Sequence, residues 1–124
     1  MAQPVSLVSY EKLLPGGQLV NRLQDLGYQV QSFNRPADLL AQAEQYKPLF
    51  AIVDIEPQAD ANCDAISRLR KNQSTAHIPV IAIVSAERED LQANVRAAGA
   101  SLVVNDQAIL VHLNELLEQA LHVE

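Results

Sequence analysis

One apolar run in this sequence ends in acidic side chains, which makes it the first place to look for chemistry. Asp54 directly follows the run Leu49–Val53, and Glu56 lies two residues further on. Because the run does not alternate with polar residues, it predicts a strand covered on both faces, with Asp54 at its carboxyl end. Ligands of open parallel sheets bind at that edge, so Asp54 is a candidate site residue. The alternative is a simple strand-ending turn, since Asp and the nearby Pro57 favour turns.

Other reactive side chains show no arrangement typical of an enzyme or a metal site. His77, His112 and His122 lack the spacing of metal ligands, and Cys63 is the only cysteine, which excludes an intramolecular disulfide. Cys63 has no basic neighbour to activate it and is interpreted as a packing residue. No Ser-His-Asp order, glycine-rich phosphate loop or zinc signature is present. We therefore expect a protein that is not an enzyme.

Composition predicts one soluble, cytoplasmic domain. The 124 residues, of which 48% are hydrophobic, are enough for a single core, so we expect one domain over residues 1–124. A net charge of -6 argues against unaided binding to phosphate backbones, which needs clustered Lys and Arg. No segment approaches the ~18 apolar residues of a membrane span. Direct nucleic-acid binding and membrane insertion are therefore not expected.

Apolar patterning predicts five strands that alternate with five helices. The expected strands are Val5–Ser9, Tyr28–Phe33, Leu49–Asp54, Val80–Val84 and Ser101–Val104. Helical spacing, capping residues and prolines predict helices over about 18–26, 36–47, 64–71, 87–98 and 106–121. Strands that alternate with helices indicate a doubly wound α/β domain with a parallel sheet.

The strand order decides which residues meet at the carboxyl edge of this sheet. Periodicity leaves two orders open, and the small size of the domain with its edge-like second strand favours 2-1-3-4-5, a flavodoxin-like sheet. This order places Asp54 beside the end of the first strand, at Ser9, Tyr10 and Glu11.

Three stretches, taken in order, resemble the receiver domain of two-component response regulators, and the resemblance runs along nearly the whole chain. They are Pro48–Asp54, Ile78–Ala86 and Ala97–Ser101. The resemblance implies a CheY-like fold and transfer of a phosphoryl group from a kinase histidine to an aspartate, assisted by Mg²⁺. It places Asp54 at the phosphoacceptor position and Ser85 at the position that contacts the phosphoryl group.

Several positions depart from what that chemistry needs in the family. The acidic pair of the family falls on Ser9 and Tyr10, so Mg²⁺ would bind only if Glu11 and Asp54 act together. The lysine position of the family falls on Asn105, which carries no positive charge.

Neighbouring residues have ordinary structural interpretations. We expect Ser85 to cap the next helix, Glu56 to be solvated, and Asn62 to replace a loop glycine in a left-handed turn. Asn105 and Asp106 are expected to start the last helix.

Together these features favour an atypical receiver, or pseudo-receiver, that stands alone without an output domain and acts through protein-protein interaction. The expected partner is a histidine kinase or a downstream effector, bound at a face that includes Arg88, Arg96 and Asp106. One alternative is a functional phosphoacceptor in a two-component phosphorelay that uses Asp54. Another is a small-ligand-binding module that uses the crevice above the first and third strands, although the loop 10–17 has only Gly16 and Gly17 to suit a phosphate. Homodimerisation through the last helix also stays open.

Overall fold

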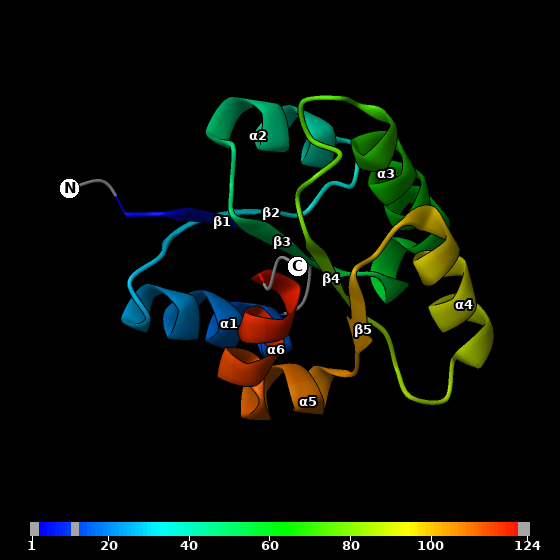
Figure 1. The fold of residues 1–124 in the computed structure, drawn as a ribbon. Helices are drawn as coiled ribbons and strands as arrows, with labels where there is room; N and C mark the ends of the chain where they lie inside the picture. The colour runs from blue at the N-terminus through cyan, green and yellow to red at the C-terminus, as the bar shows by residue number, and fades with distance from the viewer. Residues whose placement is uncertain (1–2, 11–12, 122–124) are drawn as a thin grey trace.

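The computed structural model is a parallel sheet between two layers of helices (Figure 1). It describes residues 3–10 and 13–121, and for residues 13–16 the backbone alone. The strands are β1 (Val5–Ser9), β2 (Gln29–Phe33), β3 (Phe50–Asp54), β4 (Val80–Ile83) and β5 (Leu102–Val104). All strand pairs are parallel, in the order β2-β1-β3-β4-β5. This confirms the predicted doubly wound sheet with β2 at an edge.

Helices cover both faces of the sheet (Figure 1). One face carries α2 (Asp38–Tyr46), α3 (Ala59–Lys71) and α4 (Glu89–Ala98), and the other carries α1 (Leu13–Asp25), α5 (Asp106–Val111) and α6 (Leu113–Leu121). A 3-10 turn, η1 (Glu56–Gln58), links β3 to α3. None of the helices in the described part of the chain has both the length and the apolar character needed to cross a membrane.

Two apolar clusters join the layers, one on each side of the sheet. Along β3 the side chains alternate between them: Ala51 and Val53 face α2, α3 and α4, whereas Phe50 and Ile52 face α1, α5 and α6. Every residue of β3 and β4 is buried. The two unbroken apolar runs of the sequence thus belong to strands that are covered on both sides.

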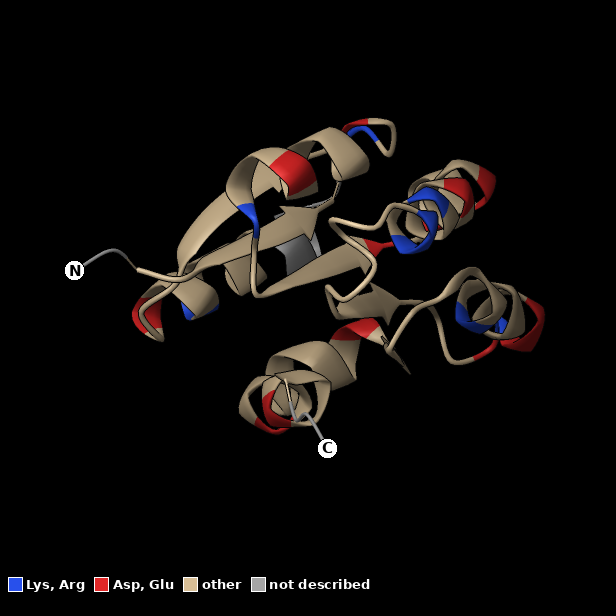
Figure 2. Ribbon diagram, turned by 45° about the horizontal axis from the view of Figure 1, so that its top comes forward, with Lys and Arg blue, Asp and Glu red and all other residues tan. Residues whose placement is uncertain are grey.

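Charged residues lie on the outer layers (Figure 2). The ribbons of α3 and α4 carry both blue and red segments, whereas the strands are almost wholly tan. In α3 the basic residues Arg68, Arg70 and Lys71 occupy the last turn, and in α4 the acidic residues Glu89 and Asp90 occupy the first turn. Both placements complement the dipole of their helix and stabilise its end.

The beginning of α1 differs from the sequence prediction. The helix begins at Leu13, so Gly16 and Gly17 lie inside it and not in a loop. Pro15 is tolerated there because the first turn of a helix needs no intrahelical N–H donor. The loop considered with the small-ligand alternative is therefore helical from Leu13, and its residues 11 and 12 lie outside the described residues.

Two later boundaries also differ. The segment 58–63, expected as a loop, is helical from Ala59, because α3 follows η1 directly. The last helical stretch is divided at His112, whose φ of -111° and ψ of 24° are not helical, so the described residues form six α-helices instead of five. The predicted apolar stripe nevertheless continues across the division, since Ile109, Leu113 and Leu117 are all buried.

Candidate functional site at the carboxyl edge of the sheet

Asp54 lies at the carboxyl end of β3, in the middle of the sheet. The strand register pairs Val53 with Ser9 of β1 and Asp54 with Ile83 of β4, so both neighbouring strands end beside Asp54. Asp54 is 8% exposed, and Ser9 is also buried. The fold therefore brings Ser9 and Asp54 to the same edge, where only a small part of the carboxylate residue meets solvent.

Asn62 fixes the turn that follows Asp54. Its Nδ2 atom donates to the main-chain oxygens of Asp54 and Ile55, at 3.1 Å each. The expectation that Asn62 adopts a left-handed loop conformation is wrong, because Asn62 lies inside α3 and is buried there. A buried amide must find hydrogen-bond partners, and the two carbonyls at the end of β3 provide them.

Glu56 and Ser85 are joined by two hydrogen bonds across the edge. The Oε2 atom of Glu56 accepts from the main-chain N of Ser85 at 2.9 Å and from its Oγ at 2.6 Å. Glu56 is therefore half-buried and bonded, contrary to the expectation that it is solvated. Ser85 does not cap α4 either, because the residue before that helix is Arg88. Sequence patterns could not show this pair, because they do not reveal that the loop after β4 passes next to η1.

Asn105 follows β5, at the position where the resemblance implies a lysine. Its Oδ1 atom accepts from the main-chain N of Ala108 at 2.8 Å, and its main-chain oxygen accepts from the N of Ile109 at 3.1 Å. Asn105 is thus the N-cap of α5, which confirms that the last helical stretch starts here. The side chain is used to stabilise a helix end.

The other positions at which the resemblance would place Mg²⁺ ligands, or their replacement, are Ser9, Tyr10 and Glu11. Tyr10 is half-buried and packs against the cluster beneath α1, α5 and α6. Glu11 lies outside the described residues. Among the residues that are described, no group of three or more His, Cys, Asp or Glu could hold a metal ion. Ser9, Tyr10 and Asp54 offer a single carboxylate, which by itself does not fit an ion that prefers several charged oxygens.

Cys63, His77 and His112 are not among the residues that the structure brings together at the candidate site. Burial, followed by the nearby Asp60 carboxylate, raises the pKa of the Cys63 thiol, in keeping with a packing role. His112 Nδ1 lies 3.6 Å from Glu115 Oε2 on the exposed side of the last helical stretch. His77 is exposed before β4, and His122 lies outside the described residues.

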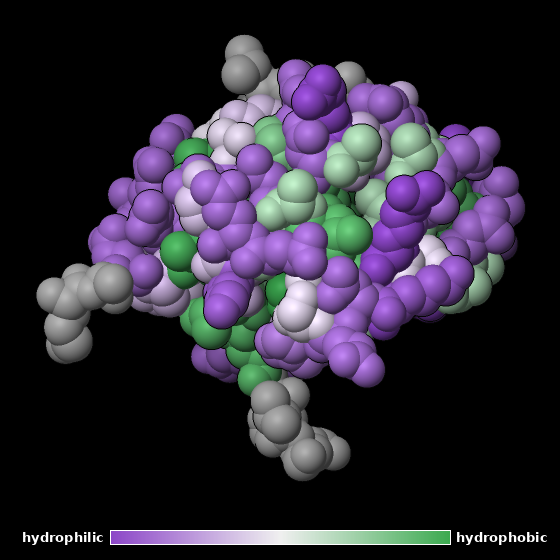
Figure 3. All heavy atoms as spheres, turned by 90° about the horizontal axis from the view of Figure 1, so that it is seen from above, coloured by the Kyte–Doolittle hydropathy of each residue, from purple (hydrophilic) through white to green (hydrophobic). Residues whose placement is uncertain are grey.

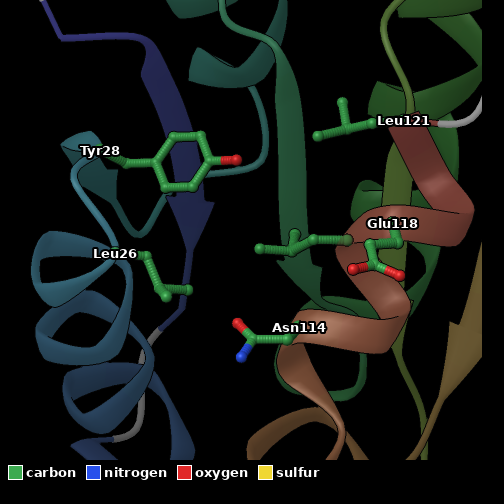
Figure 4. A pocket seen from close by; sticks show the side chains of 6 residues that line it. Leu26, Tyr28, Asn114, Glu118 and Leu121 are labelled. Carbon is green, nitrogen blue, oxygen red and sulfur yellow. The ribbon is translucent and has the colours of Figure 1, made fainter.

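Two of the grooves that the described residues form lie away from the candidate site. One, of about 210 Å³, runs between α2 and α3 and is lined by Pro36, Ala37, Leu40, Ala61, Asp64, Ala65 and Arg68. Figure 3 looks onto the side of α2 and α3 and shows apolar spheres surrounded by hydrophilic ones. The other, of about 650 Å³, lies between the end of α1, the start of β2 and α6 (Figure 4), and is lined by Leu26, Tyr28, Asn114, Leu117, Glu118 and Leu121. Neither groove includes the residues of the candidate site.

Similarity to known proteins is visible in the fold and not in the sequence. No protein-family model matches the chain, and no curated protein matches it in sequence. Solved structures do match it. The chemotaxis protein CheY4 of Vibrio cholerae has 17% identity and a TM-score of 0.83, with 96% of this chain and 99% of that chain covered.

Two further solved structures agree. The receiver domain of a sensor histidine kinase of Pseudomonas aeruginosa, crystallised with a magnesium ion coordinated in its active-site cleft, has 19% identity, a TM-score of 0.81, and coverage of 97% of this chain and 98% of that one. A response regulator from Hahella chejuensis has 23% identity, a TM-score of 0.74, and coverage of 98% and 99%. At these identities the likeness shows the fold: the chain has the CheY-like fold of response-regulator receiver domains.

Proposed function

We propose that this chain is a receiver-like signalling module that acts through contacts with a protein partner and does not depend on Mg²⁺-assisted phosphorylation. The observation that carries the proposal is that groups around Asp54 are already used within the chain. Ser85 donates both its N–H and its hydroxyl to Glu56, and Asn105 caps α5. A phosphoryl group on Asp54 would have to displace Glu56 to reach Ser85, and would find no positive charge at Asn105.

The partner in this proposal is a protein such as a histidine kinase or a downstream effector. It would bind the face formed by α4, β5 and α5, where Arg88, Arg96 and Asp106 are exposed. The three residues of β5 are half-buried and apolar, and β5 is an edge strand. This face therefore offers an apolar strip with charged residues on the neighbouring helices, a composition typical of interfaces with a polar rim.

Charge reversal tests the location of that face. Arg96→Glu should abolish binding of a partner that the unaltered chain binds, whereas Lys71→Glu on α3 should leave binding unchanged. Both residues are exposed, so the same cooperative thermal unfolding is expected for both variants. Loss of binding in both variants, or in neither, would contradict the proposed face.

Intact-mass spectrometry tests the phosphorylation part of the proposal. The chain is incubated with Mg²⁺ and acetyl phosphate beside a receiver domain that accepts phosphate under the same conditions. We expect no mass gain in this chain. The alternative function, a phosphoacceptor in a two-component phosphorelay, is favoured by the position of Asp54 at the end of β3. It predicts a gain of one phosphoryl group that disappears in Asp54→Asn, and that outcome would replace our proposal.

A second copy of the chain is the other partner we consider. The last helical stretch borders the larger groove (Figure 4). Leu26 at the rim of that groove and Val111 on α5 are exposed. Light scattering during size-exclusion chromatography measures this directly. A mass of two chains that returns to one chain in Leu26→Glu would place the dimer contact at the groove, and a single-chain mass at all concentrations would exclude it.

A further inference from the structure

Ser85 connects the turn after β3 to the beginning of α4. Its main-chain N and Oγ both donate to Glu56 Oε2, at 2.9 and 2.6 Å. On its other side, the main-chain oxygen accepts from the N of Arg88 at 3.1 Å and from Nε2 of Gln92 at 3.0 Å. Each polar group of Ser85 is thus bonded either to Glu56 or to residues at the start of α4.

The carboxylate of Glu56 is presented by a turn that has little freedom. Pro57 restricts the backbone of η1, and Asn62 holds the two carbonyls just before it. Ile55 extends the pairing with β4 by donating to Ile83 O at 3.1 Å. Because the turn is already ordered, little conformational entropy is lost when the carboxylate meets Ser85.

Two donors that converge on one carboxylate oxygen form an anion-binding arrangement. Hydrogen bonds to an ionised acceptor are roughly twice as strong as those between neutral groups. We propose that the N–H and hydroxyl of Ser85 form an anion site at the sheet edge and that Glu56 is its built-in occupant, which holds residues 85–88 and the start of α4 in one position without a phosphoryl group. The site accepts an oxyanion of the carboxylate or phosphate class.

This inference deepens the proposed function, because α4 belongs to the face that we assign to the partner. Glu56 acts here as a positioning residue. Its charge and its length must therefore hold Ser85 in place, and not merely the space that its side chain fills. A neutral isostere keeps the length and one carbonyl acceptor but loses the charge, and truncation to alanine leaves the two donors of Ser85 without their acceptor.

Amide hydrogen exchange on the full chain tests the proposal residue by residue. Glu56→Ala should speed exchange of the Ser85 amide by about tenfold to a hundredfold, since net contributions of charged hydrogen bonds fall in that range. Glu56→Gln should give an intermediate rate. Glu87→Ala, at an exposed carboxylate of the same loop, should leave the Ser85 amide unchanged. Exchange in the middle of β3 reports whether each variant keeps its overall stability.

Chemical rescue separates an anion site from a general structural role. Sodium acetate should slow exchange of the Ser85 amide in Glu56→Ala, with sodium chloride at equal ionic strength as the control, and inorganic phosphate should act in the same way. Neither anion should affect the unaltered chain, whose site is filled. An unchanged Ser85 amide in Glu56→Ala, or failure of both anions to slow it, would overturn the proposal. If Glu56→Ala does not fold, the rate in Glu56→Gln decides, and equality with the unaltered chain would overturn it.

The exchange experiment needs neither a phosphodonor nor a partner. A mass gain on Asp54 would therefore refute the proposed function while leaving the exchange result intact. Conversely, an unchanged exchange rate of the Ser85 amide in Glu56→Ala would refute the proposal that Glu56 fills an anion site. It would not affect the result of intact-mass spectrometry.

Discussion

Arg70 joins three segments that are distant in sequence, and replacing it should destabilise the fold strongly. From the last turn of α3, its Nε atom donates to Gly99 O at 2.7 Å and its Nη1 atom to Ala76 O at 2.8 Å and to Ile78 O. Its Nη2 atom donates to Ser101 Oγ at 3.2 Å. The guanidinium thereby holds the loop before β4 and the turn between α4 and β5, and burial lowers its pKa.

The magnitude follows from the acceptors that Arg70→Met leaves behind. A hydrogen bond to a charged group contributes about 1.5–3 kcal/mol when fully buried, and we take about 1 kcal/mol for each of the three carbonyls because the side chain is only partly buried. The expected loss of unfolding free energy is about 3 kcal/mol. Arg68→Met is the matched control, since Arg68 makes an exposed ion pair with Asp64 at 2.9 Å, worth roughly 0.3–0.5 kcal/mol.

Urea unfolding followed by circular dichroism measures both variants. With a slope of about 2 kcal/mol/M, Arg70→Met should lower the midpoint by about 1.5 M, with an unchanged slope, whereas Arg68→Met should lower it by less than about 0.3 M. Equal midpoints for the two variants would refute the reasoning, because they would mean that water or other donors replace the guanidinium at these three carbonyls.

Three more predictions concern single positions. Asn62→Ala should lower the unfolding free energy by about 2 kcal/mol, because the carbonyls of Asp54 and Ile55 lose their donor. Asn94→Ala, on the exposed side of α4, should have no destabilising effect. Equal thermal midpoints for the two variants would contradict this expectation. Gly99→Ala should lower the unfolding free energy measured in urea by about 2–3 kcal/mol, because its φ of 122° disfavours a side chain and the new Cβ would meet Arg70 Cγ. Gly27→Ala, at a φ of 96° with no atoms near the new Cβ, should lower it by about 1 kcal/mol. A larger loss for Gly27→Ala than for Gly99→Ala would refute the argument. Cys63 should react with iodoacetamide more slowly than a free thiol. The midpoint of its pH-rate profile should lie above that of the free thiol, because burial raises the pKa of Cys63. A midpoint below that of the free thiol would contradict this, because it would mean that a positive charge near the sulfur outweighs burial.

Sequence alone was sufficient for the five strands and for their alternation with helices, because backbone periodicity is a local property, although it missed η1 and the division of the last helix. The unbroken run Leu49–Val53 and the run that begins at Val80 predict strands buried on both faces, and both are central in the sheet. Gly99 and Asn105 mark helix ends through their own backbone and side-chain geometry, so their roles were also predictable. The alternation of these elements then leaves few sheet topologies.

The tertiary structure decided what depends on elements docking against one another. Glu56 and Ser85 are 29 positions apart, and each has an ordinary local interpretation as a solvated acid or a cap. Asn62 was misplaced for the same reason, since the carbonyls that it satisfies belong to the end of β3. Side-chain contacts between loops depend on how strands and helices are stacked, and no local pattern encodes that stacking. The sequence therefore determined that Asp54 ends a central strand, and only the tertiary structure determined that Glu56 occupies the donors of Ser85 beside it.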